Sequence, residues 1–290
     1  MKNDMNGLLL VNSFLKTSKF GDLYRFFARA AEQKGIKLDV RSSDELMAPV
    51  GERFDPRYDF VLFWDKDLRL GKRLEDSGLR LFNSVRSVEL CDDKALTAET
   101  LVAAGVCTPK TLIAPKTYSN IGYNNDAFLA RSEEYLTYPY VIKHRFGSFG
   151  AQVFLAHSRE EAARICEAAG GNEIILQEFI SESSGRDLRV NIVGDKVKGV
   201  IYRHSDTDFR SNITLGGKME KWTPDAQTVD IALAAARAVG ADFAGVDVLF
   251  GRDGPIVCEV NASPHFKTTY ECTGIDLSGE ILDYIVNKNG

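Results

Sequence analysis

Two acidic residues and an asparagine near the C-terminal end have the types and spacing of a metal-binding site. Residues 251–254, Gly-Arg-Asp-Gly, separate two β-rich runs and are typical of a hairpin turn. Alternation predicts that the apolar residues of each run share one face: Val246, Val248 and Phe250 in the first run, Ile256, Cys258 and Val260 in the second. The opposite face then brings together Asp247, Glu259 and Asn261, whose oxygen atoms suit Mg²⁺. The alternative is a surface hairpin with its polar face in water.

A lysine followed by a glycine-containing turn forms a second candidate site. The predicted strand Tyr138–Lys143 ends in this lysine, and residues 144–150, His-Arg-Phe-Gly-Ser-Phe-Gly, lead into the predicted strand Ala151–Leu155. Glycines allow the backbone to approach an anion closely, so that backbone N–H groups and the ammonium can hold a phosphate together. A turn that only joins two strands is the alternative.

Two further features could bind a nucleotide. Residues 185–221 concentrate cations in an acidic protein, and the strands Asp187–Val193 and Val197–Arg203 would bring Arg189 and Arg203 near one another. Such arginines indicate a phosphate or carboxylate site, with a solvated basic face as the alternative. The predicted strand Glu173–Ile180 ends in Gln-Glu-Phe-Ile, where a carboxylate beside backbone groups could hold an adenine edge. An ordinary strand end is equally compatible.

Strands separated by helices are predicted to precede these sites. Residues 1–90 contain apolar runs that predict a small parallel sheet: strands Leu8–Val11, Ile36–Val40, Tyr58–Trp64 and Leu79–Phe82, with a helix over Phe20–Lys34. A helix is predicted to open at Cys91-Asp92-Asp93-Lys94, with the acidic residues in its first turn. The remaining predicted helices cover Arg159–Ala169, Asp225–Val239 and a closing segment that begins at Thr273.

Composition limits the classes of protein and partner. The chain has 290 residues, 44% of them hydrophobic, and a net charge of −5, which argues against nucleic acid as a partner. Its five cysteines are scattered and contain no Cys-x-x-Cys pair, so reduced thiols are expected. Residues 8–11, Leu-Leu-Leu-Val, are too few for a signal-peptide core or a membrane span. The expectation is a soluble cytoplasmic protein with no membrane partner.

Four motifs in their order along the chain resemble the ATP-grasp superfamily, and specifically its RimK-type α-L-glutamate ligases. They are Gln-Glu-Phe-Ile at 177–180, Gly-Arg-Asp-Leu-Arg at 185–189, Asp-Phe-Arg-Ser-Asn at 208–212 with Gly216-Gly217, and Ala-Gly-Val-Asp at 244–247 with Glu-Val-Asn-Ala-Ser-Pro at 259–264. The resemblance implies an α/β fold, α+β in the grasp, in which a small parallel α/β domain precedes two α+β lobes that clasp ATP. The implied domains are residues 1–90, 91–178 and 179–290.

The resemblance also implies a role for each matching residue. Lys94 and Lys143 would contact the ATP phosphates, beneath a mobile loop that contains Gly147, Ser148 and Gly150. Glu178, Phe179 and Ile180 would hold the adenine, and Asp187 would contact the nucleotide. Arg210, Ser211 and Asn212 would line the phosphate and substrate side. The catalytic residues would be Arg189, Arg203, Arg210 and Asn212. Asp247, Glu259 and Asn261 would carry two Mg²⁺ or Mn²⁺ ions.

The implied reaction is an ATP-dependent carboxylate–amine ligation through an acyl phosphate. It would add L-glutamate or another amino acid to a peptide, a protein C-terminus or a small carboxylate, in a chain that could form a homo-oligomer. The sequence departs from the family pattern at His144, Arg145, Phe146 and Phe149, and in residues 265–271, which would border the acceptor site. The alternatives are an amino acid ligase acting on a carrier protein in lysine or arginine biosynthesis, an ATP-grasp kinase, and a nucleotide-binding regulator without turnover.

Overall fold

The N-terminal sheet is parallel and buried on both faces in the computed structural model, which describes residues 5–289. Its strand order is β2-β1-β3-β4, with β1 at Asn6–Val11, β2 at Lys37–Ser42, β3 at Phe60–Trp64 and β4 at Leu81–Phe82. Leu8 and Leu10 face one hydrophobic core, and Leu9 and Val11 face another. This double burial explains the continuous apolar runs in the sequence.

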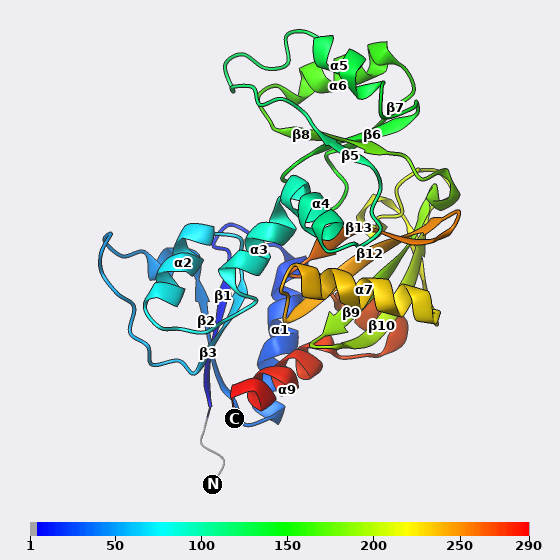
Figure 1. Ribbon diagram of the computed structural model, residues 1–290. Helices are drawn as coiled ribbons and strands as arrows, with labels where there is room; N and C mark the ends of the chain where they lie inside the picture. Colours follow the sequence, from blue (N-terminus) through cyan, green and yellow to red (C-terminus); the bar gives the residue numbers. More distant parts are fainter. Residues whose placement is uncertain (1–4, 290) are drawn as a thin grey trace.

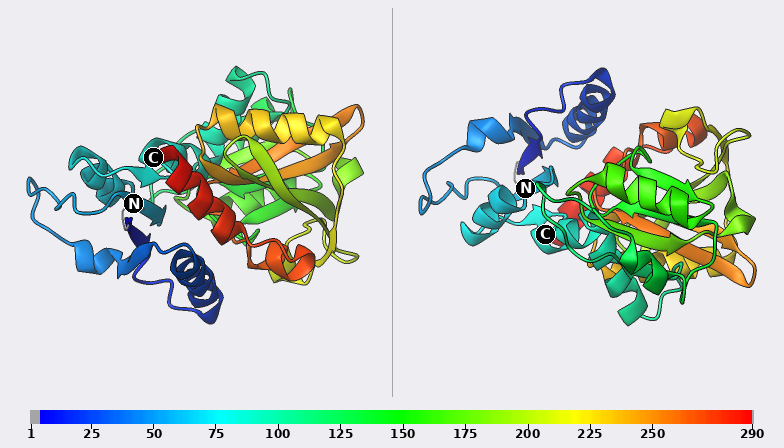
Figure 2. Two further views of the ribbon diagram at one scale, coloured as in Figure 1. Left: turned by 90° about the horizontal axis from the view of Figure 1, so that it is seen from below. Right: turned by 90° about the horizontal axis from the view of Figure 1, so that it is seen from above.

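Helices cover both faces of this sheet. Helix α1 (Ser18–Gln33) packs beside the C-terminal helix α9 (Leu277–Asn289), and Figures 1 and 2 show α9 between the N-terminal sheet and the large sheet of the C-terminal half. Helix α2 (Leu68–Asp76), which the sequence did not predict, and α3 (Val85–Asp92) contribute to the other core. Helix α9 therefore packs against the N-terminal region through its contact with α1.

The middle of the chain forms a four-stranded sheet of order β5-β8-β6-β7, which stands apart at the top of Figure 1. Its strands are β5 (Thr111–Ile113), β6 (Tyr140–His144), β7 (Val153–Ala156) and β8 (Ile174–Glu178). Helices α5 (Ala127–Ser132) and α6 (Arg159–Ala169) enclose a separate small core against this sheet. This lobe carries Lys143 at one end of β6 and Glu178 at the end of β8.

The C-terminal sheet has five antiparallel strands in the order β11-β10-β9-β12-β13. They are β9 (Arg186–Val193), β10 (Lys196–His204), β11 (Lys218–Lys221), β12 (Phe243–Gly251) and β13 (Gly254–Asn261). Helix α7 (Ala226–Ala238) packs on this sheet, and Figure 1 shows it lying along the strands. Helix α8 (Lys267–Thr273) contacts β10 and β11. The predicted hairpin at 243–261 is confirmed.

Three short 3-10 helices, Ser43–Leu46, Ser181–Ser183 and Ile213–Leu215, complete the elements. Within residues 5–289, no helix has the length and apolar character needed to cross a membrane. The division of the chain at 90/91 and 178/179 stays a prediction.

The predicted helix from Cys91 is wrong in its start. Cys91 and Asp92 end α3, and a new helix, α4 (Lys94–Ala103), begins after Asp93. The Asp93 carboxylate accepts hydrogen bonds from the backbone N–H groups of Ala95 and Leu96, at 2.9 and 3.4 Å. Asp93 is thus an N-cap, and the chain turns sharply there instead of continuing one helix. This break sets the position of Lys94, the first residue of α4.

Candidate active site

One cavity of about 680 Å³ receives side chains from all three sheets. Every residue that the sequence predicted for the site lines this cavity: Lys94, Lys143, Gly147, Ser148, Gly150, Glu178, Phe179, Ile180, Asp187, Arg189, Arg203, Arg210, Ser211, Asn212, Asp247, Glu259 and Asn261. The structure therefore brings the predicted set together. Its members' individual roles stay predictions.

The two predicted phosphate lysines are held in place by uncharged partners. Lys143 is 8% exposed, and its Nζ donates to Gln177 Oε1 at 2.7 Å and lies 3.4 Å from the Cys258 Sγ. Gln177 lies on the neighbouring strand β8. Lys94 Nζ donates to the carbonyl oxygen of Gly147 at 2.9 Å. Neither ammonium has a carboxylate partner among residues 5–289, so both keep their charge available to an anion in the cavity.

The glycine-containing loop 146–151 closes over the cavity through contacts with two other regions. Phe149 and Gly150 adopt positive φ angles of 62° and 75°, so the backbone turns tightly there. The Arg210 Nη1 donates to the carbonyl oxygens of Gly150 and Val153, at 2.8 and 3.2 Å. The Phe149 ring lies edge-on to Phe20 at 6.4 Å. The loop is thus held between helix α1 and the segment that connects β10 to β11.

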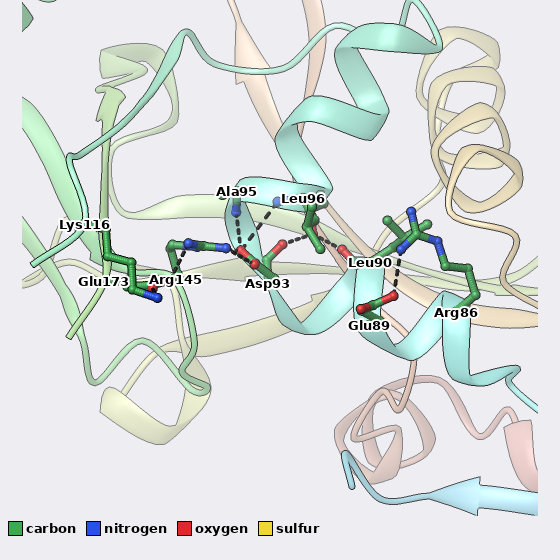
Figure 3. Close-up of polar contacts among 10 residues, drawn as sticks. Arg86, Glu89, Leu90, Asp93, Ala95, Leu96, Lys116, Arg145 and Glu173 are labelled. Atoms are coloured by element: carbon green, nitrogen blue, oxygen red, sulfur yellow. Dashed lines mark hydrogen bonds and ion pairs between the residues drawn. The ribbon is translucent and has the colours of Figure 1, made fainter. Parts of the chain in front are cut away.

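Arg145 connects this loop to the start of α4, as Figure 3 shows. Its guanidinium is paired with Asp93, through Nε at 3.0 Å and through Nη2, and Nη1 is paired with Glu173. Its backbone N–H donates to the carbonyl of Glu173 at 2.8 Å, and its carbonyl accepts from Lys94 N at 3.1 Å. Burial alone would raise the pKa of Asp93, but Arg145 and the α4 backbone hold the pKa of that carboxyl below its usual value. Arg145 therefore connects the end of β6, which carries Lys143, to the first turn of α4, which carries Lys94.

A buried group of two arginines and two aspartates forms the floor on β9, β10 and β12. Asp187 lies opposite Arg203 in the register, and Asp247 lies opposite Arg189. Arg203 binds both Asp187 oxygens, at 2.7 and 2.5 Å, and reaches Asp247 at 2.9 Å. Arg189 binds both Asp247 oxygens, at 2.5 and 3.0 Å.

This group neutralises its own charge. Burial would raise the pKa of the Asp247 carboxyl, but Arg189 and Arg203 outweigh burial and hold that pKa below its usual value. Burial would lower the pKa of Arg203, yet Asp187 and Asp247 raise it overall. Both shifts favour the ionised forms of Asp247 and Arg203. The expected proximity of Arg189 and Arg203 is confirmed, because both contact Asp247.

The predicted face alternation of β13 is wrong at Ile256 and Cys258, because the core residues of this strand are Val257 and Val260. A β-bulge pairs Asp247 with Glu259 and then Val248 with Val257, so Cys258 is the extra residue. As a consequence Val257 enters the core, and Cys258 faces the cavity beside Lys143. Burial raises the pKa of the Cys258 thiol despite the neighbouring ammonium. The bulge keeps Glu259 directly opposite Asp247.

The predicted metal ligands offer oxygen atoms with the chemistry that a divalent cation requires. The Glu259 carboxylate has no hydrogen bond or ion pair with any other residue in 5–289, and the Asn261 side chain uses only its Nδ2, which donates to Gly245 O at 3.3 Å. Asp247 receives three hydrogen bonds, two of them at Oδ1, which leaves one of its roughly four acceptor positions, at Oδ2. The set fits a hard cation, although no three His, Cys, Asp or Glu side chains cluster as ligands among the described residues.

The predicted adenine side is built by the end of β8. The Glu178 backbone N–H donates to Lys110 O at 2.8 Å, and the Glu178 carboxylate accepts from Lys110 N at 3.2 Å. Phe179 packs edge-on against Phe209, with ring centres 6.2 Å apart. One oxygen of the Glu178 carboxylate thus already accepts a hydrogen bond within the protein. The pair Phe179 and Phe209 gives the cavity an apolar wall.

Motif-based reasoning missed the contribution of the N-terminal sheet. Nine residues from residues 1–90 line the cavity and were not predicted, among them Asn12, Lys19, Phe20, Asp65 and Lys66. The available signal was their position, because Asn12 and Asp65 directly follow the buried strands β1 and β3. The segment 265–271 does border the cavity, through His265, Lys267, Thr268 and Glu271. Its Phe266 is fully buried among Phe26, Phe27 and Trp64 and is a core residue.

The fold is that of the ATP-grasp proteins. The crystal structure of a RimK domain ATP-grasp protein from Sphaerobacter thermophilus DSM 20745 superposes with a TM-score of 0.72 at 20% identity, covering 95% of this chain and 98% of that one. The family model for the RimK-like ATP-grasp domain matches residues 91–285. This chain belongs to the RimK-like ATP-grasp family.

Two curated relatives show how far the similarity extends. A probable alpha-L-glutamate ligase of Maridesulfovibrio salexigens is 35% identical over 217 residues, which cover 74% of this chain and 69% of the relative. Beta-citrylglutamate synthase B of Danio rerio is 32% identical over 226 residues, which cover 77% of this chain and 54% of the relative. The chain thus spans about half the length of the fish relative.

Proposed function

We propose that this protein is an ATP-dependent carboxylate–amine ligase that joins an amino acid, L-glutamate in the leading form of the proposal, to a carboxylate acceptor. The observation that carries the proposal is the convergence in one cavity of two uncompensated lysines, a glycine-containing loop and the acidic hairpin 243–261. Both curated relatives carry names that involve glutamate. A peptide or protein C-terminus and a small carboxylate are the proposed acceptor classes.

A carboxylate must be activated before an amine can attack it, because oxide is not a feasible leaving group. In the proposed reaction the acceptor carboxylate takes the γ-phosphoryl group of ATP, and the amine then displaces phosphate from the acyl phosphate. Lys94, Lys143 and the N–H groups of residues 147–150 would bind the ATP phosphates. Arg210, which holds the loop through Gly150, would keep water away from the acyl phosphate.

The remaining residues would bind the other parts of the substrates. Glu178, Phe179 and Ile180 would surround the adenine, and Ser211 and Asn212 would lie beside the transferred phosphoryl group. Glu259, Asn261 and the remaining acceptor position of Asp247 would hold divalent cations, which would offset phosphate charge. The proposal includes two such ions, either Mg²⁺ or Mn²⁺. Arg189 and Arg203 would fix Asp247 and lend positive potential to the site.

The test is phosphate release from ATP–Mg²⁺ across a panel of amino acids, with and without carboxylate acceptors, followed by mass spectrometry of the products. The proposal expects release that needs both an amine and a carboxylate, and a product heavier by one or more amino acid residues. A phosphorylated product without free phosphate would instead identify a kinase. ATP binding without release under any condition would identify a regulator.

A further inference from the structure

Two polar side chains follow neighbouring strands at the carboxyl edge of the N-terminal sheet. Asn12 comes directly after β1, and Asp65 directly after β3. Strand β1 pairs with β2 on one side and with β3 on the other, all in parallel. The connection after β1 leads to β2 on one side, and the connection after β3 leads to β4 on the other side, so the gap between β1 and β3 is a switch point, where open α/β sheets bind ligands.

Asp65 has one carboxylate oxygen that the protein leaves unpaired. The side chain lines the cavity but is only 5% exposed. Its Oδ1 accepts from Asn12 Nδ2 at 3.0 Å and from Lys66 N at 2.7 Å. Its Oδ2 is buried and has no hydrogen-bond partner in the described chain. A buried charged oxygen without a donor is unfavourable, so a ligand that supplies a donor would be stabilised there.

The same cavity contains an unpaired cation from the N-terminal region. Lys19, in the first turn of α1, lines the cavity, and its Nζ lies 3.5 Å from the centre of the Phe149 ring. Burial lowers the pKa of Lys19, and no carboxylate in residues 5–289 pairs with it. Its neighbours on the cavity wall differ, because Lys66 is paired with Asp92 and Lys267 with Asp22.

We propose that the carboxyl edge of the N-terminal sheet binds the incoming amino acid, with Asp65 receiving its α-ammonium group and Lys19 a carboxylate. An α-amino acid carries both of these charges, whereas ATP and a simple carboxylate acceptor carry no ammonium. Asn12 is a positioning residue, because it holds Asp65 Oδ1 and thereby directs Oδ2. This inference rests on the proposed ligase function and adds the residues that recognise the amine substrate.

The test is a binding comparison between L-glutamate and glutarate, which keeps both carboxylates and lacks the amine. Calorimetry would be done on the full chain saturated with a non-hydrolysable ATP analogue and Mg²⁺. The unchanged protein should prefer L-glutamate, and Asp65→Asn should reduce this preference by about tenfold or more while leaving glutarate binding nearly unchanged. Equal affinities in the unchanged protein, or a preference that survives in Asp65→Asn, would overturn the inference.

Three variants separate recognition from folding. Asn12→Ala should weaken the preference by a smaller factor with the same pattern. Asp59→Asn is the matched control, because Asp59 is exposed at the opposite end of β3 and binds Asn6 N at 2.7 Å. Tyr24→Phe tests a neighbouring buried hydroxyl that also lacks a partner, and it should keep the preference. The assignment is contradicted if Asp59→Asn or Tyr24→Phe loses the preference for L-glutamate while Asp65→Asn keeps it. Thermal unfolding would confirm that each variant is folded.

The binding comparison needs no turnover, so the two proposals can fail separately. If Asp65→Asn removes the preference but no amino acid supports phosphate release, the subsite stands and the ligase proposal fails. If the protein is a ligase but the KM for L-glutamate is the same in Asp65→Asn, the ligase stands and the subsite is wrong. A higher KM for the carboxylate acceptor alone would also contradict the assignment.

Discussion

The floor of the cavity and the edge of the N-terminal sheet treat buried charge in opposite ways. On β9, β10 and β12, Arg203 and Arg189 satisfy both aspartates, at distances from 2.5 to 3.0 Å. At the carboxyl edge of β3, Asp65 keeps an oxygen without any partner in the described residues. In the first arrangement each buried carboxylate already has an arginine partner, whereas in the second one carboxylate oxygen obtains a partner only when a donor arrives.

This difference predicts different consequences of substitution. Removing one member of the paired group leaves a buried charge of opposite sign without its partner. Such a substitution should mainly lower the free energy of unfolding. Removing a group that no protein atom satisfies should cost ligand binding or turnover and leave stability nearly unchanged. Glu259 is the informative exception, because it lies next to the paired group but has no partner in residues 5–289.

Arg203→Met should give the largest effect. It leaves Asp187 without its two hydrogen bonds and removes one of the two arginines at Asp247, in a region where Arg203 is 6% exposed. The expected loss is about 3–5 kcal/mol in the free energy of unfolding, measured with urea. Arg252→Met is the control, because Arg252 forms an exposed pair with Glu182 at 3.3 Å. Equal midpoints for the two variants would show that the buried group does not stabilise the fold.

Glu259→Gln should lower turnover by about 100-fold or more, the scale of losing one strong electrostatic contact to a reacting group. Stability should hardly change, because the carboxylate has no partner among the described side chains. Asp253→Asn, at the exposed tip of the same hairpin, should leave both quantities unchanged. Full activity in Glu259→Gln would show that Glu259 is not a metal ligand. Unfolding of this variant would show that Glu259 stabilises the fold, as the paired arginines and aspartates do.

Arg145→Gln should act mainly on ATP affinity. Without the guanidinium, Asp93 and Glu173 lose their common partner, and the start of α4 is no longer held to the loop that follows Lys143. The KM for ATP should rise by about tenfold, which corresponds to about 1.4 kcal/mol, with a smaller change in kcat. Arg86→Gln breaks an exposed pair with Glu89 at 2.6 Å and should have little effect. A fall in kcat at constant KM would contradict this positioning role.

The smallest expected effect is a change in the alkylation rate of Cys258, which reports on ligand binding near Lys143. Its thiol lies 3.4 Å from Lys143 Nζ, and burial raises its pKa, so alkylation at neutral pH should be slow. Cys107 is exposed and should be labelled first. ATP–Mg²⁺ should slow the labelling of Cys258 and leave that of Cys107 unchanged, as mass spectrometry of peptides can measure. Equal protection of both thiols would indicate a general tightening of the fold.

The proximity of Arg189 and Arg203 could be predicted because it follows from strand periodicity, whereas their ion pairs with Asp187 and Asp247 were not predicted. Arg189 and Arg203 belong to two strands joined by the turn at Gly194, and Asp247 alternates with buried valines on β12. The bulge at Cys258 could not be found in this way, because alternation assumes an unbroken ladder. The break at Asp93 combines a local N-cap with a contact to Arg145, 52 residues away, and only the first of these could be found in the local sequence.

The edge of the N-terminal sheet was missed for a related reason. Asp65 and Asn12 belong to no sequence motif, and each is ordinary as a residue that follows a strand. Their significance arises only when β1 and β3 are neighbours and the cavity of the other two sheets meets their carboxyl ends. Sequence motifs therefore identified the region proposed for ATP, whereas the region proposed for the amino acid required the tertiary structure.

The most direct test of the central claim is an isotope experiment with an acceptor whose carboxylate is labelled with ¹⁸O. Attack of the amine on an acyl phosphate breaks the bond between the carbonyl carbon and the bridging oxygen, which leaves with the phosphate. The account therefore predicts one ¹⁸O atom in each released phosphate and one amide formed per phosphate, both measured by mass spectrometry. Phosphate without label, with both ¹⁸O atoms retained in the carboxylate, would contradict activation through an acyl phosphate.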